Sequence, residues 1–306
     1  MSLPALLANL RQPQVRDLAW LAYAPNLLAE PAAQVVAADW FVQRNPNLQQ
    51  QLAQWDAQPQ VLLQALAKDK SHFLGPYFEQ LVLFLLQHTP GVEVLAWRLQ
   101  VQADGRTLGE FDVLFFDQLT GEQVHWELAL KYYLGLGERW FGPNSNDRLD
   151  IRYAKLFDQQ LLLGQTQAAF LREHGLVPPQ RCQALMKGWL FSSSEPAELP
   201  DYVDRNHLHG HWCYVADIEK ILIEAQTWVW LDKPHWLAPL SSEAVDGVGQ
   251  AGLAMRARLD AHFAGAGPAV MLAGFVQQQG QWCELRRVMV VANSWPTTKT
   301  MKKDKP

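Results

Sequence analysis

The chain has 306 residues, of which 49% are hydrophobic, and its formal net charge is −5 at pH 7. This length suffices for one large elaborated domain or two modest ones, each with a full core. The acidic balance argues against a protein that coats nucleic acid regardless of sequence, because such binding depends on clustered lysine and arginine. A local basic patch stays compatible with this charge.

The cysteines and the apolar runs bear on the compartment. The three cysteines, Cys182, Cys213 and Cys283, are far apart and match no metal-ligand spacing. We interpret them as free thiols, and together with a start that lacks a charged leader and an adequate apolar run they predict a cytoplasmic protein. The longest strongly apolar run, residues 81–86, is far short of a bilayer span, so no membrane association is expected.

The composition predicts four regions along the chain. Residues 1–70 are rich in Ala, Leu and Gln, with prolines that interrupt the helical spacing, and they predict a cap of several short helices. Residues 71–191 hold the alternating patterns of an α/β core, and residues 192–296 predict a β-rich lobe after a linker-like start. The last ten residues, 297–306, predict a disordered tail.

A helix with one conspicuous acid opens the predicted core. It should run over residues 75–88, because proline suits the first helical turn and Pro90 prevents continuation. Glu79 shares a helical stripe with Val82 and Leu86, so its carboxylate is directed toward the core, where a buried acid needs a partner. The alternative is a glutamate near the helix start that only complements the helix dipole.

Three strands should follow this helix, at residues 92–101, 109–116 and 123–132. Short turn sequences separate them, which predicts an antiparallel meander. In the middle strand Asp112 stands among phenylalanines and a valine, which is unusual for a buried strand unless the carboxylate binds something.

The third strand alternates strictly over the sequence E-Q-V-H-W-E-L-A-L-K-Y, residues 122–132. Successive side chains of a strand point to opposite faces, so His125, Glu127 and Lys131 share one face. The other face is apolar and suited to a core. An acid and a base are therefore directed to the same side of the sheet.

A glycine-rich segment and a second helix come next. The segment at residues 134–147 is too long for a simple connection, which is typical of a functional or mobile loop, and it fits no dinucleotide or phosphate-binding fingerprint. The helix should begin after a cap at Asn146 or Asp147 and end near Leu163. Gln160 interrupts the apolar stripe of this helix.

Three cations follow one another on this second helix. Arg148, Arg152 and Lys155 stand at i, i+4 and i+7, a line that could meet the phosphates of nucleic acid. The alternative is an ordinary solvated face, which is the commoner reading of a stripe of three charges.

The remaining strands are predicted at residues 184–191, 229–231, 269–277 and 282–291. The first of them completes a strand-helix-strand crossover, which requires at least one parallel neighbour. The predicted fold class is therefore α/β (α+β), with a mixed central sheet flanked by helices.

Three alternating histidines lie between these strands. His207, His209 and His211 occur in N-H-L-H-G-H-W. Clustered histidines can bind metal, but no acid or thiol stands at a helpful spacing beside them. We predict a polar loop here.

The order of these elements resembles the core of the PD-(D/E)XK nuclease-like superfamily over residues 71–191. That core comprises a helix with a glutamate, a strand, a strand with an aspartate, a strand with glutamate and lysine, a helix and a strand. The sequence also resembles a bacterial family known as domain of unknown function 1853 over most of its length. The motifs that carry this second resemblance are F-L-G-P-Y-F-E, G-E-F-D-V-L, W-E-L-A-L-K-Y-Y-L and G-P-N-S-N-D-R-L-D.

The nuclease-like resemblance implies a metal site. By position, Asp112 and Glu127 would be the metal-binding carboxylates, with the Leu128 backbone carbonyl as a further ligand. Hard oxygen ligands suit Mg²⁺ or Mn²⁺. The expected chemistry is hydrolysis of a phosphodiester in DNA or RNA.

The resemblance also implies three supporting roles. Lys131 would orient the nucleophile, Glu79 would lie beside the metal, and Gln160 would be an auxiliary polar residue. The chain departs from the superfamily at two points. Ala129 occupies the usual lysine position, so Lys131 stands one step further along the same face, and Asp112 follows a phenylalanine instead of a proline.

Two classes of function remain open at this point. One is a metal-dependent nuclease whose basic line and glycine-rich loop contact the nucleic-acid backbone. The other is a non-catalytic module of the same fold that binds nucleic acid or a protein, in which the buried acids make structural hydrogen bonds. A serine or cysteine hydrolase has no supporting motif, since the serines at 192–194 lack the glycines of a nucleophile elbow.

Overall fold

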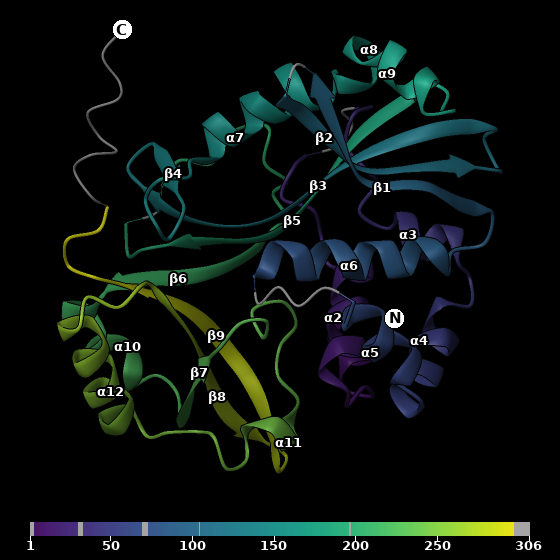
Figure 1. Cartoon of the computed structure of the whole chain (residues 1–306). Coiled ribbons are helices and arrows are strands. Elements are labelled where there is room, and N and C mark those ends of the chain that lie inside the picture. Colours follow the sequence, from purple (N-terminus) through teal and green to yellow (C-terminus); the bar gives the residue numbers. More distant parts are fainter. Residues whose placement is uncertain (1–2, 30–32, 69–72, 104, 196, 297–306) are drawn as a thin grey trace, which may run out of the picture. The chain divides into compact units, whose positions relative to one another are not determined.

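A computed structural model describes residues 3–29, 33–68, 73–103, 105–195 and 197–296, so the predicted tail at 297–306 lies outside the described residues. The fold class is mixed α/β, as predicted, with nine strands in a mixed sheet flanked by helices (Figure 1). The chain divides into two compact units. The first comprises Met1–Leu130, Arg152–Gly188 and Asp201–Asn206, and the second comprises Lys131–Ile151, Trp189–Pro200 and His207–Pro306.

The first unit begins with short helices, as the proline-interrupted pattern predicted. Helix α2 forms their centre, because residues 15–22 are all buried. Proline in its first turn suits a helix start, where an amide hydrogen would have no partner. The five helices are α1 (Leu3–Leu7), α2 (Pro13–Tyr23), α3 (Trp40–Arg44), α4 (Leu48–Ala57) and α5 (Gln60–Leu66).

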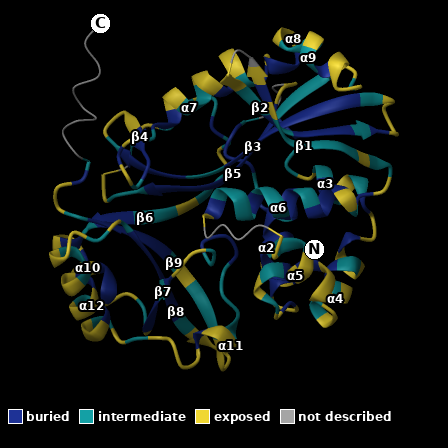
Figure 2. Ribbon diagram, viewed as in Figure 1, coloured by how far each residue is buried: buried dark blue, intermediate teal, exposed yellow. Residues whose placement is uncertain are grey.

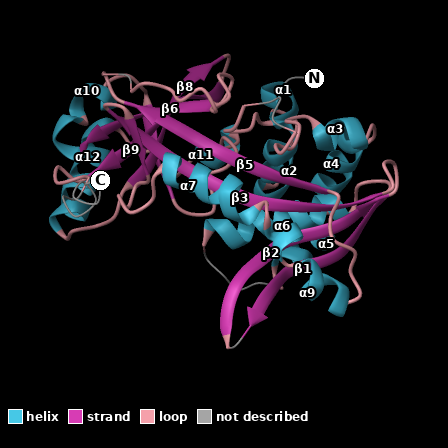
Figure 3. Cartoon of the chain, turned by 90° about the horizontal axis from the view of Figure 1, so that it is seen from above, coloured by secondary structure: helices cyan, strands magenta, loops and turns pink. Residues whose placement is uncertain are grey.

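The predicted helix and meander of the core are confirmed. Helix α6 covers Leu74–Gln87, and strands β1 (Val92–Ala103), β2 (Arg106–Asp117) and β3 (Glu122–Leu136) follow. The strands pair in antiparallel order β1-β2-β3, and β1 and β2 run side by side along their length (Figure 3). Helix α6 contacts β1, whereas α8 (Leu163–Thr166) and α9 (Ala168–Glu173) lie on the opposite side of these strands (Figure 1).

The second predicted helix is interrupted. Instead of one helix from 146 or 147 to 163, the chain forms α7 (Leu149–Lys155), a π-helical turn (Leu156–Gln160) and α8 (Leu163–Thr166), and then α9 (Ala168–Glu173). The Leu161 amide bonds the Leu156 carbonyl at 2.9 Å, which is the i to i+5 bond of a π turn. The extra residue in this turn shifts every later side chain around the helix axis.

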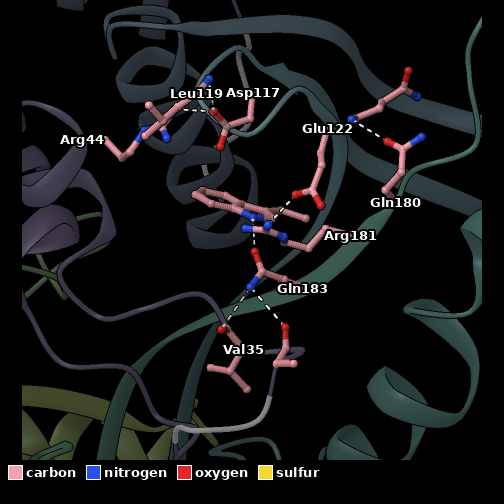
Figure 4. Close-up of polar contacts among 11 residues, drawn as sticks. Val35, Arg44, Asp117, Leu119, Glu122, Gln180, Arg181 and Gln183 are labelled. Carbon is pink, nitrogen blue, oxygen red and sulfur yellow. Dashed lines mark hydrogen bonds and ion pairs between the residues drawn. The ribbon is translucent and has the colours of Figure 1, made fainter.

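A polar cluster joins the N-terminal segment to the strands of the first unit (Figure 4). Arg44 bonds Asp117 at the end of β2, and Arg181 bonds Glu122 at the start of β3. Gln183 of β5 (Arg181–Ser192) donates to the carbonyls of Ala33 and Val35 at 3.2 and 3.3 Å. The bonds of Arg44 and Gln183 attach the N-terminal segment to one end of the strands, and the bond of Arg181 joins β5 to β3.

The second unit contains the strands β6-β9-β8-β7 in this order, the end of β5 from Trp189 onward, and β4 (Arg139–Phe141) beside the end of β3. β5-β6 and β6-β9 are parallel pairs, and β7-β8-β9 is antiparallel. A buried cluster joins α10, α12 and these strands. The elements are β6 (Leu208–Tyr214), a 3-10 turn (Val215–Asp217), α10 (Glu219–Leu222), β7 (Thr227–Leu231), α11 (Ser242–Val245), α12 (Gly252–Ala264), β8 (Val270–Gln278) and β9 (Gln281–Val291).

The polar loop predicted for the histidines is wrong, because residues 208–214 form strand β6. Its buried residues are Trp212 and Cys213, and the strand pairs on both sides, with β5 and with β9. Gly210 permits a close approach, since a Cβ atom there would lie 2.5 Å from the Phe191 ring. The alternation of histidines is therefore that of a strand.

Buried residues lie along the strands and on the inner faces of the helices, and the exposed residues gather on the outer helix faces and loops (Figure 2). The three cysteines are free, as predicted. No helix in the described part of the chain is both long and apolar enough to cross a bilayer.

Candidate functional site

Asp112 lies where strands β2 and β3 separate. In the described pairing of these strands, the last pair is Val113 with Trp126. Beyond it, the Leu128 amide donates to Asp112 Oδ2 at 2.7 Å. A side-chain carboxylate thus takes the place that a backbone carbonyl of β2 would have in a continuous ladder. This bond fixes Asp112 beside the residue that precedes Leu128, which is Glu127.

Glu127 is held by a series of two hydrogen bonds. Its side chain is fully buried. Gln160 Nε2 donates to Glu127 Oε2 at 2.5 Å, and Arg152 Nη1 donates to Gln160 Oε1 at 2.8 Å. Gln160 is the last residue of the π-helical turn, so the irregular helix places this amide against the acid. The expectation that Gln160 points inward to the site acids is consistent with this bond.

His125 completes the buried group. Its side chain is 0% exposed, and Nε2 lies 3.3 Å from Glu127 Oε1. The Phe111 ring packs edge-on against the imidazole, with centroids 4.9 Å apart. Neither ring nitrogen, nor Glu127 Oε1, makes a hydrogen bond of normal geometry to any described residue. Burial lowers the pKa of His125 to about 4, against the opposing charge of Asp112, so the ring is neutral at pH 7.

The two acids have strongly raised pKa values. Burial raises the pKa of Asp112 to about 8, and the charge of Glu127 adds to this, whereas the Leu128 amide opposes it. Burial raises the pKa of Glu127 to about 7, with the Arg152 charge as the main opposing cause. Asp112 also lies within side-chain hydrogen-bonding reach of Glu127. The titrations of two such acids are coupled, and acids with raised pKa values are frequent at functional sites.

Glu79 lies near this pair but is engaged elsewhere. Its negative charge raises the pKa of Asp112, which places it in the same neighbourhood. Arg98 Nε donates to Glu79 Oε2 at 2.8 Å. Arg98 has a left-handed φ of 48° and stands between the pairs Trp97–Val113 and Leu99–Phe111, hence opposite Asp112. The partner that a half-buried Glu79 requires is therefore this arginine.

Lys131 forms an ion pair with Asp147. Its Nζ donates to Asp147 Oδ2 at 2.5 Å, and the Tyr133 hydroxyl donates to Asp147 Oδ1 at 3.3 Å. Lys131 belongs to the second unit, whereas Asp112 and Glu127 belong to the first. Four residues of a strand span about 14 Å, more than the roughly 6 Å stem of a lysine. The predicted convergence of Lys131 with the two acids stays a prediction.

The three cations expected on one helical line have separate environments. Arg148 precedes α7, is buried and bonds Asp150 through Nη2 at 2.5 Å. Arg152 donates to Gln160 and so supports the acid pair. Lys155 is exposed at the end of α7, and its charge lowers the pKa of Glu127. A continuous exposed line of three is not formed.

The donor set around the pair bears on metal binding. Among the described residues, no group of three or more His, Cys, Asp or Glu side chains could hold a metal ion. Two carboxylates and a backbone carbonyl are nonetheless oxygen donors of the kind that Mg²⁺ accepts while it keeps several waters. The buried Glu127 Oε1 without a hydrogen bond to the described residues is an acceptor that a cation would satisfy. The residues Asp112, Glu127 and Leu128 therefore fit a hydrated divalent cation.

Fold and site together define a mixed α/β protein with a buried carboxylate pair on neighbouring strands of its sheet. The chain belongs to the domain of unknown function family DUF1853, whose profile matches residues 16–291. No curated protein and no solved structure gives a significant match to the chain. The family assignment agrees with the motifs in the sequence and carries no activity with it.

Three residues have contacts in this site that the sequence prediction did not give them. His125 shares the face of Glu127 in the alternating strand, and that alternation was the available signal for it. Arg98 gave no signal, because its place opposite Asp112 depends on the register of β1 with β2. Arg152 was noticed as a cation, but its direction toward Gln160 depends on the π-helical turn.

Proposed function

We propose that the protein is a metal-dependent phosphodiesterase that acts on nucleic acid, DNA or RNA. The observation that supports this most strongly is the buried pair Asp112 and Glu127, with pKa values raised to about 8 and about 7. Two adjacent buried acids lower the stability of the fold unless a partner compensates their charge. A divalent cation is the partner that best fits a set of oxygen donors.

Asp112, Glu127 and the Leu128 carbonyl would hold Mg²⁺ or Mn²⁺. When bound, the cation supplies Lewis-acid polarisation of the scissile phosphate. The chain itself supplies the preorganisation. The Leu128 amide fixes one carboxylate at 2.7 Å and the Gln160 amide fixes the other at 2.5 Å. Arg152 bonds Gln160 in turn, so Glu127 keeps its orientation when substrate enters.

Lys131 is the candidate for orientation of the nucleophile and for neutralisation of developing charge. Asp147 accepts a hydrogen bond from the lysine ammonium at 2.5 Å, which restricts the rotamers of the lysine. In this role Asp147 is a positioning residue. Glu79 acts on the pair through its charge, and Arg98 holds it.

The first test is a nuclease assay on single- and double-stranded DNA and RNA with Mg²⁺ or Mn²⁺, and with a chelator as the metal-free reference. Asp112→Asn and Glu127→Gln should each lower the rate by at least about 100-fold, the scale for loss of one group that stabilises a transition state. Glu93→Gln, an exposed acid on β1, is the matched control and should retain full activity. Full cleavage by both site variants, with both proteins folded, contradicts the proposal.

A non-catalytic module that binds nucleic acid or a protein is the second candidate. It is favoured by the bond of Lys131 to Asp147 and by the lack of a third clustered ligand side chain among the described residues. In that case Asp112 and Glu127 are structural. Calorimetry with Mn²⁺ separates the two candidates, because the module predicts no binding that depends on Asp112 or Glu127.

A further inference from the structure

A hollow of about 500 Å³ lies in the first unit between α5, α6 and β1. This volume is within the range of small-molecule sites, which is about 300–1,000 Å³. Leu83, Phe84 and Trp97 give it apolar and aromatic walls. Helices α5 and α6 contact each other, and α6 contacts β1, so the walls are regular elements (Figure 1).

The polar groups of the hollow are cationic or neutral. Lys68 carries positive charge, Arg98 carries a positive charge that Glu79 offsets at its Nε, and Gln80 and Gln87 offer amide groups. No acid is among the described residues that line it. The protein as a whole has a net charge of −5, so this hollow departs from the average surface in the direction that an anionic ligand requires.

The hollow adjoins the acid pair through Arg98. This arginine lines the hollow, bonds Glu79 at 2.8 Å and stands opposite Asp112 in the β1-β2 ladder. Its guanidinium carbon is 5.4 Å from the Trp97 ring centroid, so the positive charge lies beside the aromatic ring. An anionic group bound to Arg98 would therefore lie at the strand next to the one that carries Asp112.

We propose that the hollow binds one nucleotide unit of a single-stranded nucleic acid, next to the phosphodiester that meets Asp112 and Glu127. The base stacks on Trp97, because aromatic rings bind bases of any sequence by their faces. Lys68 and Arg98 contact the adjoining backbone phosphate. Gln80 and Gln87 can donate to or accept from base edges. The inference rests on the proposed function for the identity of the polymer.

The test is fluorescence anisotropy of a short end-labelled single-stranded oligonucleotide, with chelator present so that cleavage does not occur. Trp97→Ala should weaken binding at least about fivefold, the lower limit for loss of one base–aromatic stack. Lys68→Glu should also weaken binding, because it removes a phosphate contact and adds a negative charge. Arg172→Glu makes the same change of charge at an exposed position of α9 and is the control. Its affinity should stay within twofold of that of the native protein, once the general effect of the changed net charge on binding is subtracted. AMP should compete better than inorganic phosphate.

Unchanged affinity in folded Lys68→Glu and Trp97→Ala overturns the inference, and so does competition by inorganic phosphate that equals competition by AMP. Lys68 is exposed, so its variant keeps the fold and decides the matter if Trp97→Ala does not fold. Asp112→Asn separates this inference from the proposed function. That variant should lose cleavage and keep oligonucleotide binding. Pocket variants that lose binding while Asp112→Asn keeps full cleavage would leave the hollow assigned and the catalytic proposal refuted.

Discussion

Burial acts on Asp112, Glu127 and His125 in opposite directions. It raises the pKa of the two acids and lowers that of the histidine, because the charged form is disfavoured in each case. The neutral histidine can therefore lie 3.3 Å from Glu127 without a second charge in the interior. A cation would reverse this balance, since it favours the ionised acids.

The hydrogen bond from Gln160 gives a prediction about metal affinity. Gln160→Leu removes the 2.5 Å bond to Glu127 and should weaken Mn²⁺ binding by about 10- to 100-fold, as loss of a partner of a metal ligand does. Isothermal titration calorimetry measures the change. Gln159→Leu, at the exposed preceding residue, is the control and should bind as the native protein does. Equal affinity of both variants would remove Gln160 from the site.

The raised pKa values give a prediction about stability without metal. An acid whose pKa is raised on folding contributes stability that is complete below its unfolded pKa and is lost as pH rises through the folded value. For Asp112 this interval runs from 3.8 to about 8, and for Glu127 from 4.5 to about 7. His125 acts in the other direction, but only below its ordinary value of 6.5.

The melting temperature in chelator should therefore fall between pH 6.5 and pH 8, because the two acids are ionised in the unfolded chain and stay largely protonated in the folded one. Asp112→Asn keeps an acceptor for the Leu128 amide and removes one ionisation, so its melting temperature should vary less over the same range. Scanning calorimetry measures both proteins. A native curve that rises with pH, or equal slopes for the two proteins, would show that Asp112 is ionised throughout.

The sequence alone was sufficient to predict the two site acids, but it was not sufficient to predict the hydrogen bonds that hold them. Alternation of side chains directed attention to Glu127, and an acid among apolar neighbours directed it to Asp112. The Leu128 amide, by contrast, reaches Asp112 only because β2 and β3 separate after Trp126. Such a bond depends on tertiary register, which local pattern does not encode.

Among the elements, the strands and α6 could be predicted closely, because turn residues and alternation define them. Two elements could not. The π-helical turn at Leu156–Gln160 has no sequence signature, since it is one extra residue within an otherwise helical pattern. Strand β6 was missed because its histidines made a strand resemble a polar loop. In both places tertiary packing decides the local structure.

Strand β6 gives a prediction about stability. Gly210→Ala would place a Cβ atom 2.5 Å from the Phe191 ring and 3.0 Å from the Arg287 carbonyl oxygen, so it should destabilise the protein by about 1–3 kcal/mol, as overpacking does. Urea denaturation measures the free energy of unfolding. Gly75→Ala is the matched control, because a Cβ atom at that position of α6 meets nothing within 4 Å. A Gly210 variant as stable as the control would place Phe191 elsewhere.

At the scale of the whole molecule, the two units are interleaved along the chain. Each is assembled from three segments, and β3 and β5 each contribute residues to both. Composition marks contiguous stretches, such as the predicted divisions at residues 70 and 191, and it contains no information about segments that return to an earlier unit. Contacts between distant residues create such an arrangement.

The returning segment Asp201–Asn206 gives a prediction about fragments. The Ala29 amide bonds the Tyr202 carbonyl, the Asp204 amide bonds the Leu27 carbonyl, each at 2.9 Å, and Tyr153 stacks on Tyr202 at 4.0 Å between centroids. A fragment of residues 1–206 should therefore resist protease better than one of residues 1–200. Limited proteolysis of the two fragments at equal concentration checks this. Equal half-lives would mean that these six residues do not stabilise the first unit.

The Leu128 amide has an unusual partner for a residue inside a strand. Its proton is held by a carboxylate instead of a neighbouring backbone carbonyl. Deuterium uptake at this single position therefore follows the charge on one side chain, whereas uptake at the amides of the ordinary ladder follows the opening of the sheet. Leu128 is thus a built-in reporter, readable by nuclear magnetic resonance, of whether Asp112 is protonated, ionised or drawn toward a cation.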